Sequence, residues 1–358
     1  MKAVIIAGGL GTRLRPLTNN IPKPIVPVAN QPFILQQIEL LKTHGVTEII
    51  LNLHYLSDSI KELTREKKLG VKIDYSIEEH PLGTAGAVKN AEEFFKGEEL
   101  IIVLNGDILT DINIGEVIKF HRKHKAMATL TLTPVSDPTP YGLVLTDPHG
   151  RITDFIEKPS WERVQGIDKW EINAGIYVLD PKIFTELPKH APVMFENYVF
   201  PNLLKKGAPV YGYSTKAFWM DIGNPQKYRM AHEAILRSEV TSFRVYGTRD
   251  KGNIFIGENA EIDKTARTTG PIIIGRRVKA GAHTVLREYS CVGDNVTIGK
   301  KSLISRAIIW EGTKIGNNVK LDGCIVGAHC KIEDDVIISE GSVIADNAII
   351  TKGSIIGA

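Results

Sequence analysis

The residues best suited to chemistry lie at the start of the chain. An apolar run, Lys2–Ile6, predicts a buried parallel strand. Three glycines within four residues follow it: Gly8, Gly9 and Gly11. Glycines let backbone N–H groups approach anionic oxygens closely, and Thr12, Arg13 and Lys23 add a hydroxyl and two positive charges. The segment therefore predicts a cradle for a polyphosphate.

Two familiar phosphate loops do not fit this segment. A P-loop needs a Lys-Ser or Lys-Thr pair after its last glycine, and the dinucleotide fingerprint needs a third glycine three residues after its second. Here Gly11 is followed by Thr12, Arg13 and Leu14. The cradle must belong to a different kind of nucleotide-binding protein.

Two aspartates are candidate metal ligands. Asp107 follows the apolar strand predicted at 100–104, and Asp221 follows the apolar residues 218–220. Ligands of an open α/β sheet lie at the carboxyl ends of its strands, so Asp107 should face the cradle. A carboxylate beside a triphosphate is most simply explained as a Mg²⁺ ligand. Asp111 is a weaker candidate, because its surroundings are typical of a loop or a helix cap.

Further groups are suited to a base and a phosphorylated sugar. The loop 81–86 contains Gly83, which lets a flat base lie against the backbone, and Thr84, whose hydroxyl could read its edge. Lys158 suits a phosphate monoester. Sugar hydroxyls need acceptors and donors such as Glu157 and Asn173, and Gly142 permits a backbone contact.

These motifs, in this order, resemble the sugar-1-phosphate nucleotidyltransferases, also called sugar-nucleotide pyrophosphorylases. The resemblance covers Gly8 to Arg13, Lys23, Asp107, Asp221 and the segments between them. The loop 81–86 has Gly86 where thymidylyltransferases of the family usually have glutamine, and it looks like the loop of mannose-1-phosphate guanylyltransferases. The resemblance implies GTP and mannose 1-phosphate as substrates and GDP-mannose as product.

A mechanism follows from charge. A sugar phosphate is mostly dianionic at neutral pH, so the nucleophile needs no general base. The ten histidines lie outside the motifs. Arg13 and the loop amides should hold the β- and γ-phosphates, while Lys23 and Lys158 hold the attacking phosphate. Mg²⁺ on Asp107 and Asp221 should bridge the reacting phosphates.

The elements that must position these residues form two domains. Residues 1–240 alternate strands and helices at first, with helices at 31–44, 57–68, 84–95 and 114–125, and become strand-rich after 128. Ser57 is expected to cap the second of these helices. This pattern predicts a doubly wound, mostly parallel sheet. Residues 241–252 are the expected linker.

Residues 253–358 repeat with a period of six. Apolar residues recur at this spacing from Ile256 to Ile304. The repeat then resumes one residue early at Ile309, and it shifts by one residue again at Val326. Glycine often follows them. This predicts a parallel β-helix of hexapeptide repeats, which resembles the left-handed β-helix of many pyrophosphorylases. Its open ends and flat faces favour a homo-oligomer.

Composition restricts the remaining possibilities. A net charge of +3 over 358 residues does not favour nucleic acid or an anionic membrane as a partner. The apolar N-terminal run is too short for a signal peptide or a membrane span. The three cysteines, Cys291, Cys324 and Cys330, are expected to be buried and unpaired, as in a cytoplasmic enzyme.

Other functions stay open. Within the same chemistry, the sugar could be glucose 1-phosphate or a heptose 1-phosphate, with another base. A bifunctional enzyme would use His283 or His329 of the β-helix for acyl transfer, although no acceptor motif accompanies them. A regulatory homologue that senses sugar nucleotides would not need Arg13 and both aspartates, so their presence favours catalysis.

Overall fold

A computed structural model describes residues 1–357 of the chain. Their contacts divide them into two compact units. The first contains residues 1–10 and 34–219, and the second contains residues 11–33 and 220–358. The segment 11–33 therefore has its contacts mainly with the C-terminal half of the chain, far from it in sequence. The predicted boundary near 240 and the linker at 241–252 stay predictions.

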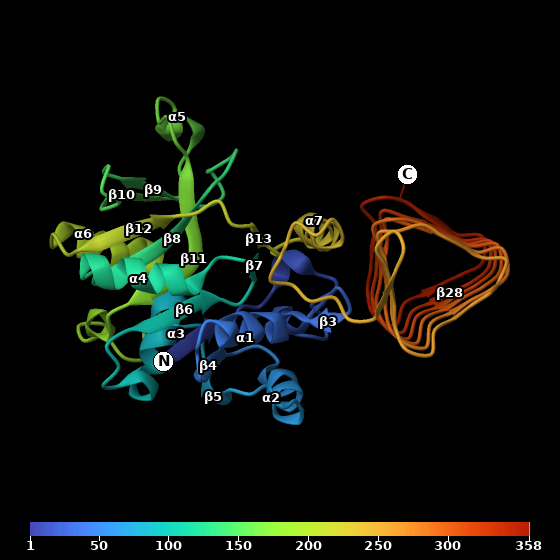
Figure 1. Cartoon of the computed structure of the whole chain (residues 1–358), viewed down its shortest axis with the longest axis horizontal. Coiled ribbons are helices and arrows are strands. Elements are labelled where there is room, and N and C mark those ends of the chain that lie inside the picture. The colour runs from blue at the N-terminus through green and yellow to red at the C-terminus, as the bar shows by residue number, and fades with distance from the viewer. Residues whose placement is uncertain (358) are drawn as a thin grey trace. The chain divides into compact units, whose positions relative to one another are not determined.

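A nine-stranded sheet forms the core of the first unit (Figure 1). Its parallel part runs in the order β5 (Lys72–Ile77), β4 (Glu48–Leu53), β1 (Lys2–Ile6), β6 (Ile101–Asn105). The other strands are β8 (Ala128–Pro134), β9 (Gly142–Thr146), β10 (Ile152–Glu157), β11 (Glu171–Leu179) and β12 (Val210–Ser214). β11 pairs antiparallel with β6 and joins the two parts. The predicted Rossmann-like fold is confirmed, and its sheet is mixed, since β9, β10 and β11 pair antiparallel with their neighbours.

Helices connect the strands. They are α1 (Phe33–Thr43), α2 (Ser57–Glu66), α3 (Gly83–Asn90), α4 (Ile114–His124), α5 (Trp161–Val164), α6 (Phe200–Lys205) and α7 (Pro225–Leu236). Apolar residues of α3 and α6 pack in a core with the strands, which includes Val88, Leu203, Val103 and Tyr177.

Three local predictions were wrong. Ser57 is the first residue of α2 and does not cap it, because Leu56 occupies the cap position in a left-handed conformation. α1 begins at Phe33, since Gln31–Pro32 forms the short strand β3, which pairs with β2 (Pro27–Val28). The helix expected at 84–95 ends at Asn90, and Glu92–Phe95 is a separate 3₁₀ turn.

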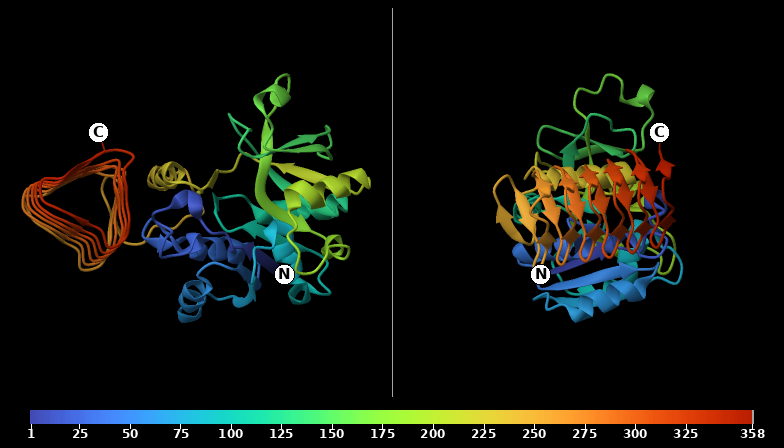
Figure 2. Two further views of the ribbon diagram at one scale, coloured as in Figure 1. Left: turned by 180° about the vertical axis from the view of Figure 1, so that it is seen from behind. Right: turned by 90° about the vertical axis from the view of Figure 1, so that its right-hand side faces the viewer.

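The C-terminal part of the second unit is the predicted left-handed parallel β-helix. It appears as a triangular coil, orange to red, in Figure 1, and the right-hand view of Figure 2 shows its turns stacked side by side. Eighteen short strands, β15 (Ile254–Ile256) to β32 (Ile355–Ile356), form three parallel sheets, and the antiparallel strand β14 (Thr248–Asp250) joins the first of them. The apolar residues of the hexads fill its interior. Cys291, Cys324 and Cys330 are buried free thiols, as predicted.

The two slips in the repeat correspond to shorter turns of the coil. Ser290 follows its partner Ile272 by eighteen residues, whereas Ile308 follows Cys291 by seventeen and Ile325 follows Ile308 by seventeen. Val343 then follows Ile325 by eighteen again. One corner of the triangle therefore loses a residue in two successive turns.

Glycines in the coil allow the turns to stack. A Cβ on Gly299 would lie 2.4 Å from the carbonyl oxygen of Gly316 in the next turn. We expect Gly299→Ala to lower the free energy of unfolding of the β-helix by about 3 kcal/mol, because the backbone on the other side cannot yield. The measurement is urea denaturation followed by circular dichroism.

Gly353→Ala is the matched control for this prediction. Gly353 has a positive φ of 74° but nothing within 4 Å of its Cβ position, so only backbone strain of about 1 kcal/mol should appear. Equal losses in the two variants would show that close stacking does not determine the effect.

Candidate functional site

The predicted residues fall into two groups, one in each compact unit. The first group lies where β1 and β6 end side by side: Ile6 pairs with Asn105, so Gly8 and Asp107 follow adjacent strand ends. From β1 the chain runs to β4 and β5 on one side, and it then returns to β6 on the other side of β1, which makes this the switch point of the sheet. Ligands of open α/β sheets bind in the crevice at such a point.

Backbone contacts fix this switch point. The N–H of Gly106 donates to the carbonyl of Ile6 at 2.8 Å, and a Cβ on Gly106 would lie 2.6 Å from the same oxygen. Ala7 donates to the carbonyl of Asn52 at 2.9 Å. The strand ends that carry Gly8 and Asp107 are therefore held by main-chain hydrogen bonds.

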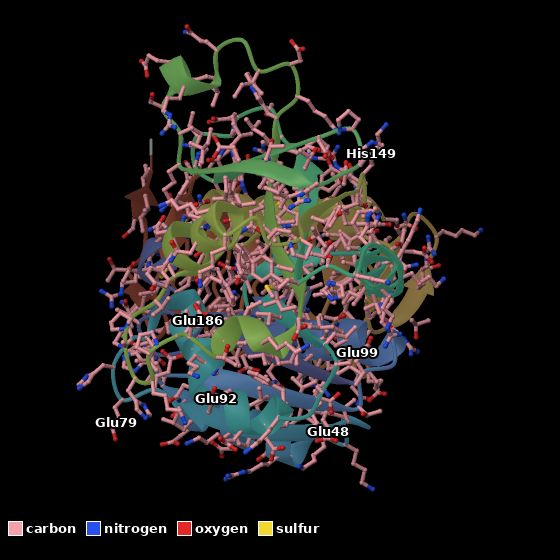
Figure 3. All side chains as sticks on the ribbon, turned by 90° about the vertical axis from the view of Figure 1, so that its left-hand side faces the viewer. Glu48, Glu79, Glu92, Glu99, His149 and Glu186 are labelled. Atoms are coloured by element: carbon pink, nitrogen blue, oxygen red, sulfur yellow. The ribbon has the colours of Figure 1, made fainter. Side chains whose placement is uncertain are left out.

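A buried glutamate connects the phosphate loop with the base loop. Glu78 follows β5, and its Oε2 accepts from the N–H of Leu82 at 2.9 Å. Its Oε1 lies 3.2 Å from the Cβ position of Gly8, and burial raises the pKa of this carboxyl. Its neighbour Glu79 is exposed and points outward (Figure 3). Sequence analysis missed Glu78, although it lies just before the predicted base loop.

The base loop is packed tightly against residues 191–196. Gly83 has a φ of +70°. A Cβ on Gly86 would lie 2.6 Å from the carbonyl oxygen of Ala191, so position 86 has no room for a side chain. Thr84 donates its hydroxyl to Glu196 at 2.8 Å and accepts from the N–H of Phe195 at 2.9 Å. The Thr84 hydroxyl is thus bonded within the domain, and reading of a base by this loop stays a prediction.

The predicted sugar-phosphate residues surround Tyr177. Asn173 donates to the Tyr177 hydroxyl at 2.8 Å. Burial raises the pKa of Tyr177 well above 10, and the negative charges of Glu196, Glu157 and Asp107 act in the same direction. These carboxylates therefore lie close enough to Tyr177 for their charges to act on its hydroxyl.

Glu157 and its neighbour Lys158 occupy the end of β10. Burial and the charge of Glu196 raise the pKa of Glu157, and Lys158 opposes them. The Lys158 side chain is exposed, with its Nζ 3.8 Å from Glu157. Glu157 Oε2 lies 3.0 Å from the Cβ position of Gly142, so only glycine leaves this space open. Sequence analysis missed Glu196, since residues 192–200 show no recognisable pattern.

The second group lies in the other compact unit. Gly11 adopts a φ of +64° and opens a 3₁₀ turn, Thr12–Leu14, on which Thr12 and Arg13 are exposed. Thr18 donates to the Gly11 carbonyl at 2.8 Å, and the Cβ of Lys23 lies 3.2 Å from the Cβ position of Gly11. Lys23 itself is buried.

Asp221 lies beside this turn. A guanidinium nitrogen of Arg13 is 3.3 Å from the Cβ position of Gly223, whose N–H donates to Asp221 Oδ1 at 3.2 Å. The other oxygen, Oδ2, accepts from Lys227 on α7. Lys227 was missed because a spacing of six residues does not mark an ion pair in sequence. Asp111 accepts from the N–H of Phe218 at 2.7 Å, which fits its expected loop role.

The carboxylate oxygens of the predicted aspartates are ligands that suit a hard divalent cation. Mg²⁺ is usually held by one or two carboxylates together with substrate phosphates, so a protein site with many ligands is not required. Within residues 1–357, no group of three or more His, Cys, Asp or Glu side chains could hold a metal without substrate. Whether Asp107 and Asp221 hold such an ion stays a prediction.

The comparisons with known proteins define the class. Residues 2–238 match the family model described as nucleotidyl transferase. The chain belongs to the nucleotidyl transferase family, whose members generally use a divalent metal ion. Residues 251–356 match the model of the LbH domain of EIF2B subunit epsilon.

Relatives and solved structures with similar sequences carry more specific names. A rice (Oryza sativa subsp. japonica) protein named probable mannose-1-phosphate guanylyltransferase 2 is 34% identical over 95% of this chain and 99% of its own length. A UTP–glucose-1-phosphate uridylyltransferase from Synechocystis is 30% identical over 92% of this chain and 88% of its own length. The structure of HddC from Yersinia pseudotuberculosis with GMP-PN is 33% identical, with a TM-score of 0.56, over 64% of this chain and 97% of HddC.

Helix α7 carries a buried histidine, His232, that bonds to segment 11–33 and should make the fold sensitive to acid. His232 accepts from the N–H of Ala29 at 3.1 Å, and burial lowers its pKa to about 4. The unfolded chain binds a proton near pH 6.5, so stability is complete at neutral pH and is lost as pH falls towards 4. We expect the free energy of unfolding to fall by about 2 kcal/mol between pH 7 and pH 5 from this group.

The measurement is urea denaturation at both pH values, with His232→Gln as the comparison. Glutamine keeps an acceptor but does not titrate in this range. A variant with the same pH dependence as the wild type would contradict this assignment to His232.

Proposed function

We propose that the chain transfers a guanylyl group from GTP to mannose 1-phosphate and releases pyrophosphate. The observation that carries this proposal is the switch point between β1 and β6, where Gly8 and Asp107 follow adjacent strand ends. The name of the rice relative and the GMP-PN bound to HddC support the choice of base and sugar.

The chain's own residues would perform the reaction by binding and orienting two anions. Gly8, Gly9, Gly11 and Thr12 would present backbone N–H groups to the triphosphate, and Arg13 would stabilise the charge that develops on the leaving pyrophosphate. Lys23 and Lys158 would bind the attacking phosphate and reduce its repulsion by the triphosphate. Mg²⁺ held by Asp107 and Asp221 would neutralise charge on the reacting phosphates.

The remaining contacts concern the base and the sugar. Backbone groups at Gly83 would face the base, because the Thr84 hydroxyl is already paired. Glu157 and Asn173 would bind sugar hydroxyls, with Gly142 leaving room for them. No proton needs to be removed from the dianionic nucleophile, which agrees with a site built from charges and amides.

A second candidate is uridylyl or other nucleotidyl transfer to glucose 1-phosphate or a heptose 1-phosphate, and the Synechocystis relative favours it. The test is pyrophosphate release with each of four nucleoside triphosphates against mannose, glucose and heptose 1-phosphates. GTP with mannose 1-phosphate should give the highest kcat/KM. A preference for UTP with glucose 1-phosphate would select the second candidate.

The charged residues should be essential for turnover. We expect Arg13→Ala and Asp107→Asn to lower kcat by about 100-fold each, since an oriented charge contributes about 3 kcal/mol to the transition state. Excess chelator should abolish the reaction, and added Mg²⁺ should restore it. Asp58→Asn is the matched control, because this exposed aspartate pairs with Lys61 within helix α2. Near-normal kcat in Arg13→Ala, or full activity in chelator, would refute these roles.

The other functions have less support. His283 and His329 are exposed corner residues of the β-helix in left-handed conformations, and an acyl transfer role would appear as turnover of acetyl-CoA. A regulatory homologue would release no pyrophosphate with any substrate pair.

No helix in residues 1–357 is long and apolar enough to cross a bilayer, and we propose a cytoplasmic location without nucleic-acid or membrane partners.

We also propose that the chain forms a homo-oligomer through its β-helix. The last turn exposes large apolar side chains, with Ile349 66% and Ile355 71% exposed. Sedimentation velocity of the full chain should show more than one subunit, and Ile349→Lys with Ile355→Lys should shift the chain towards the monomer. A wild-type chain that sediments as a monomer at all concentrations would refute this proposal.

A further inference from the structure

The β-helix is in contact with the segments that carry part of the proposed chemistry. Arg13 and Lys23 lie in the segment 11–33, and Asp221 lies just before α7. Both segments belong to the same compact unit as the β-helix. Within that unit, several contacts hold segment 11–33 and α7 against the β-helix.

A strained turn of the phosphate segment is bonded to the β-helix. Ala29 and Asn30 connect β2 with β3 and both have left-handed φ values, 47° and 62°. Asn30 donates its amide to the carbonyl of Val292 at 2.7 Å and accepts from the thiol of Cys291 at 3.1 Å. Backbone strain persists only where the surroundings fix it, and here the β-helix supplies the fixing contacts.

A buried aromatic pair forms the second attachment. Trp310 of the β-helix donates its indole N–H to the Tyr228 hydroxyl on α7 at 3.0 Å. The same hydroxyl donates to the carbonyl of Pro27 in the phosphate segment. Both side chains are buried, so loss of the hydroxyl would leave two polar groups without a partner.

Helix α7 lies along the corner of the β-helix that has the shortened turns. The Arg237 guanidinium is 4.9 Å from the ring centroid of Tyr289, and Arg229 contacts Glu340 at 2.8 Å and the Gly323 carbonyl at 3.4 Å. All three contacts lie at that corner: Gly323 and Glu340 are on successive turns, and Tyr289 is two turns before Gly323. The irregularity of the repeat therefore coincides with the place where α7 packs.

A further contact lies at the other end of the phosphate segment. The side chain of Asn20 hydrogen bonds to Asp346, a half-buried aspartate near the last turn. The segment is thus attached to the β-helix through Asn20 and through Asn30, and Lys23 lies between these attachments. Arg13 precedes them, against Gly223 at the start of the connection to α7.

We propose that the β-helix positions the phosphate-binding segment 11–33 for catalysis, with Asn30, Tyr228 and Trp310 as positioning residues. This inference rests on the proposed function, in which Arg13 and Lys23 bind phosphates. The β-helix would then affect turnover through the geometry of these two side chains, without contacting substrate itself.

The test is Asn30→Gly in the full-length chain. Glycine keeps the left-handed backbone and removes only the link to Val292 and Cys291. Asn318→Gly is the matched control: Asn318 is also left-handed, at φ 56°, and donates its amide to Asp335 at 3.1 Å, within the β-helix. Tyr228→Phe is a second variant, which removes the other attachment.

Hydrogen exchange tests the positioning without relying on activity. In Asn30→Gly the amides of Val26 and Ala29 should exchange about threefold to tenfold faster than in the wild type, the change expected for loss of one side-chain hydrogen bond. In Asn318→Gly they should not change. Unchanged exchange of residues 11–33 in both Asn30→Gly and Tyr228→Phe would overturn the inference, whether or not the chain makes GDP-mannose.

Kinetics test whether positioning acts through the proposed charges. With GTP and mannose 1-phosphate, Asn30→Gly should lower kcat about tenfold, and Asn318→Gly should leave it unchanged. The factor by which Arg13→Ala lowers kcat should be at least about threefold smaller in the Asn30→Gly background than in the wild type, because the two changes disrupt one interaction. Fully additive effects, or equal losses in Asn30→Gly and Asn318→Gly, would overturn the inference. Absence of pyrophosphate release by the wild type would instead refute the proposed function.

Discussion

The hydrogen bond from Gly106 to the carbonyl of Ile6 holds together the point on which the first unit depends. It joins β1 and β6 just before they diverge, and only glycine permits this approach, because a Cβ would lie 2.6 Å from the carbonyl oxygen. Gly8 and Asp107 are therefore fixed by the main chain of two central strands. A site supported in this way is oriented before substrate arrives, which suits chemistry that depends on the placement of charges.

Much of the architecture could be predicted because local patterns and tertiary burial agree. The uninterrupted apolar residues 101–104 predict a strand buried on both faces, and β6 is the central strand of the sheet. A period of six has no helical explanation, and the turns of the β-helix follow it except at the corner that is shortened in two successive turns. Gly45 follows the end of α1 with a φ of +82°, a conformation that suits glycine.

Features that depend on distant partners could not be predicted. The hydroxyl of Thr84 looked available for a ligand, but Glu196 and Phe195, more than a hundred residues away, bond to it. Glu78 and Lys227 acquire significance only from what packs against them. The same is true of segment 11–33, whose grouping with the C-terminal half no local pattern reveals.

The two seventeen-residue turns have a consequence for how such repeats are read. A free coil has no reason to change its step, since every turn meets an identical neighbour. Here the step changes at the corner that α7 occupies, where Arg229 reaches Gly323. In this chain, the place where the hexad count falls short in the sequence is therefore also the corner on which α7 packs.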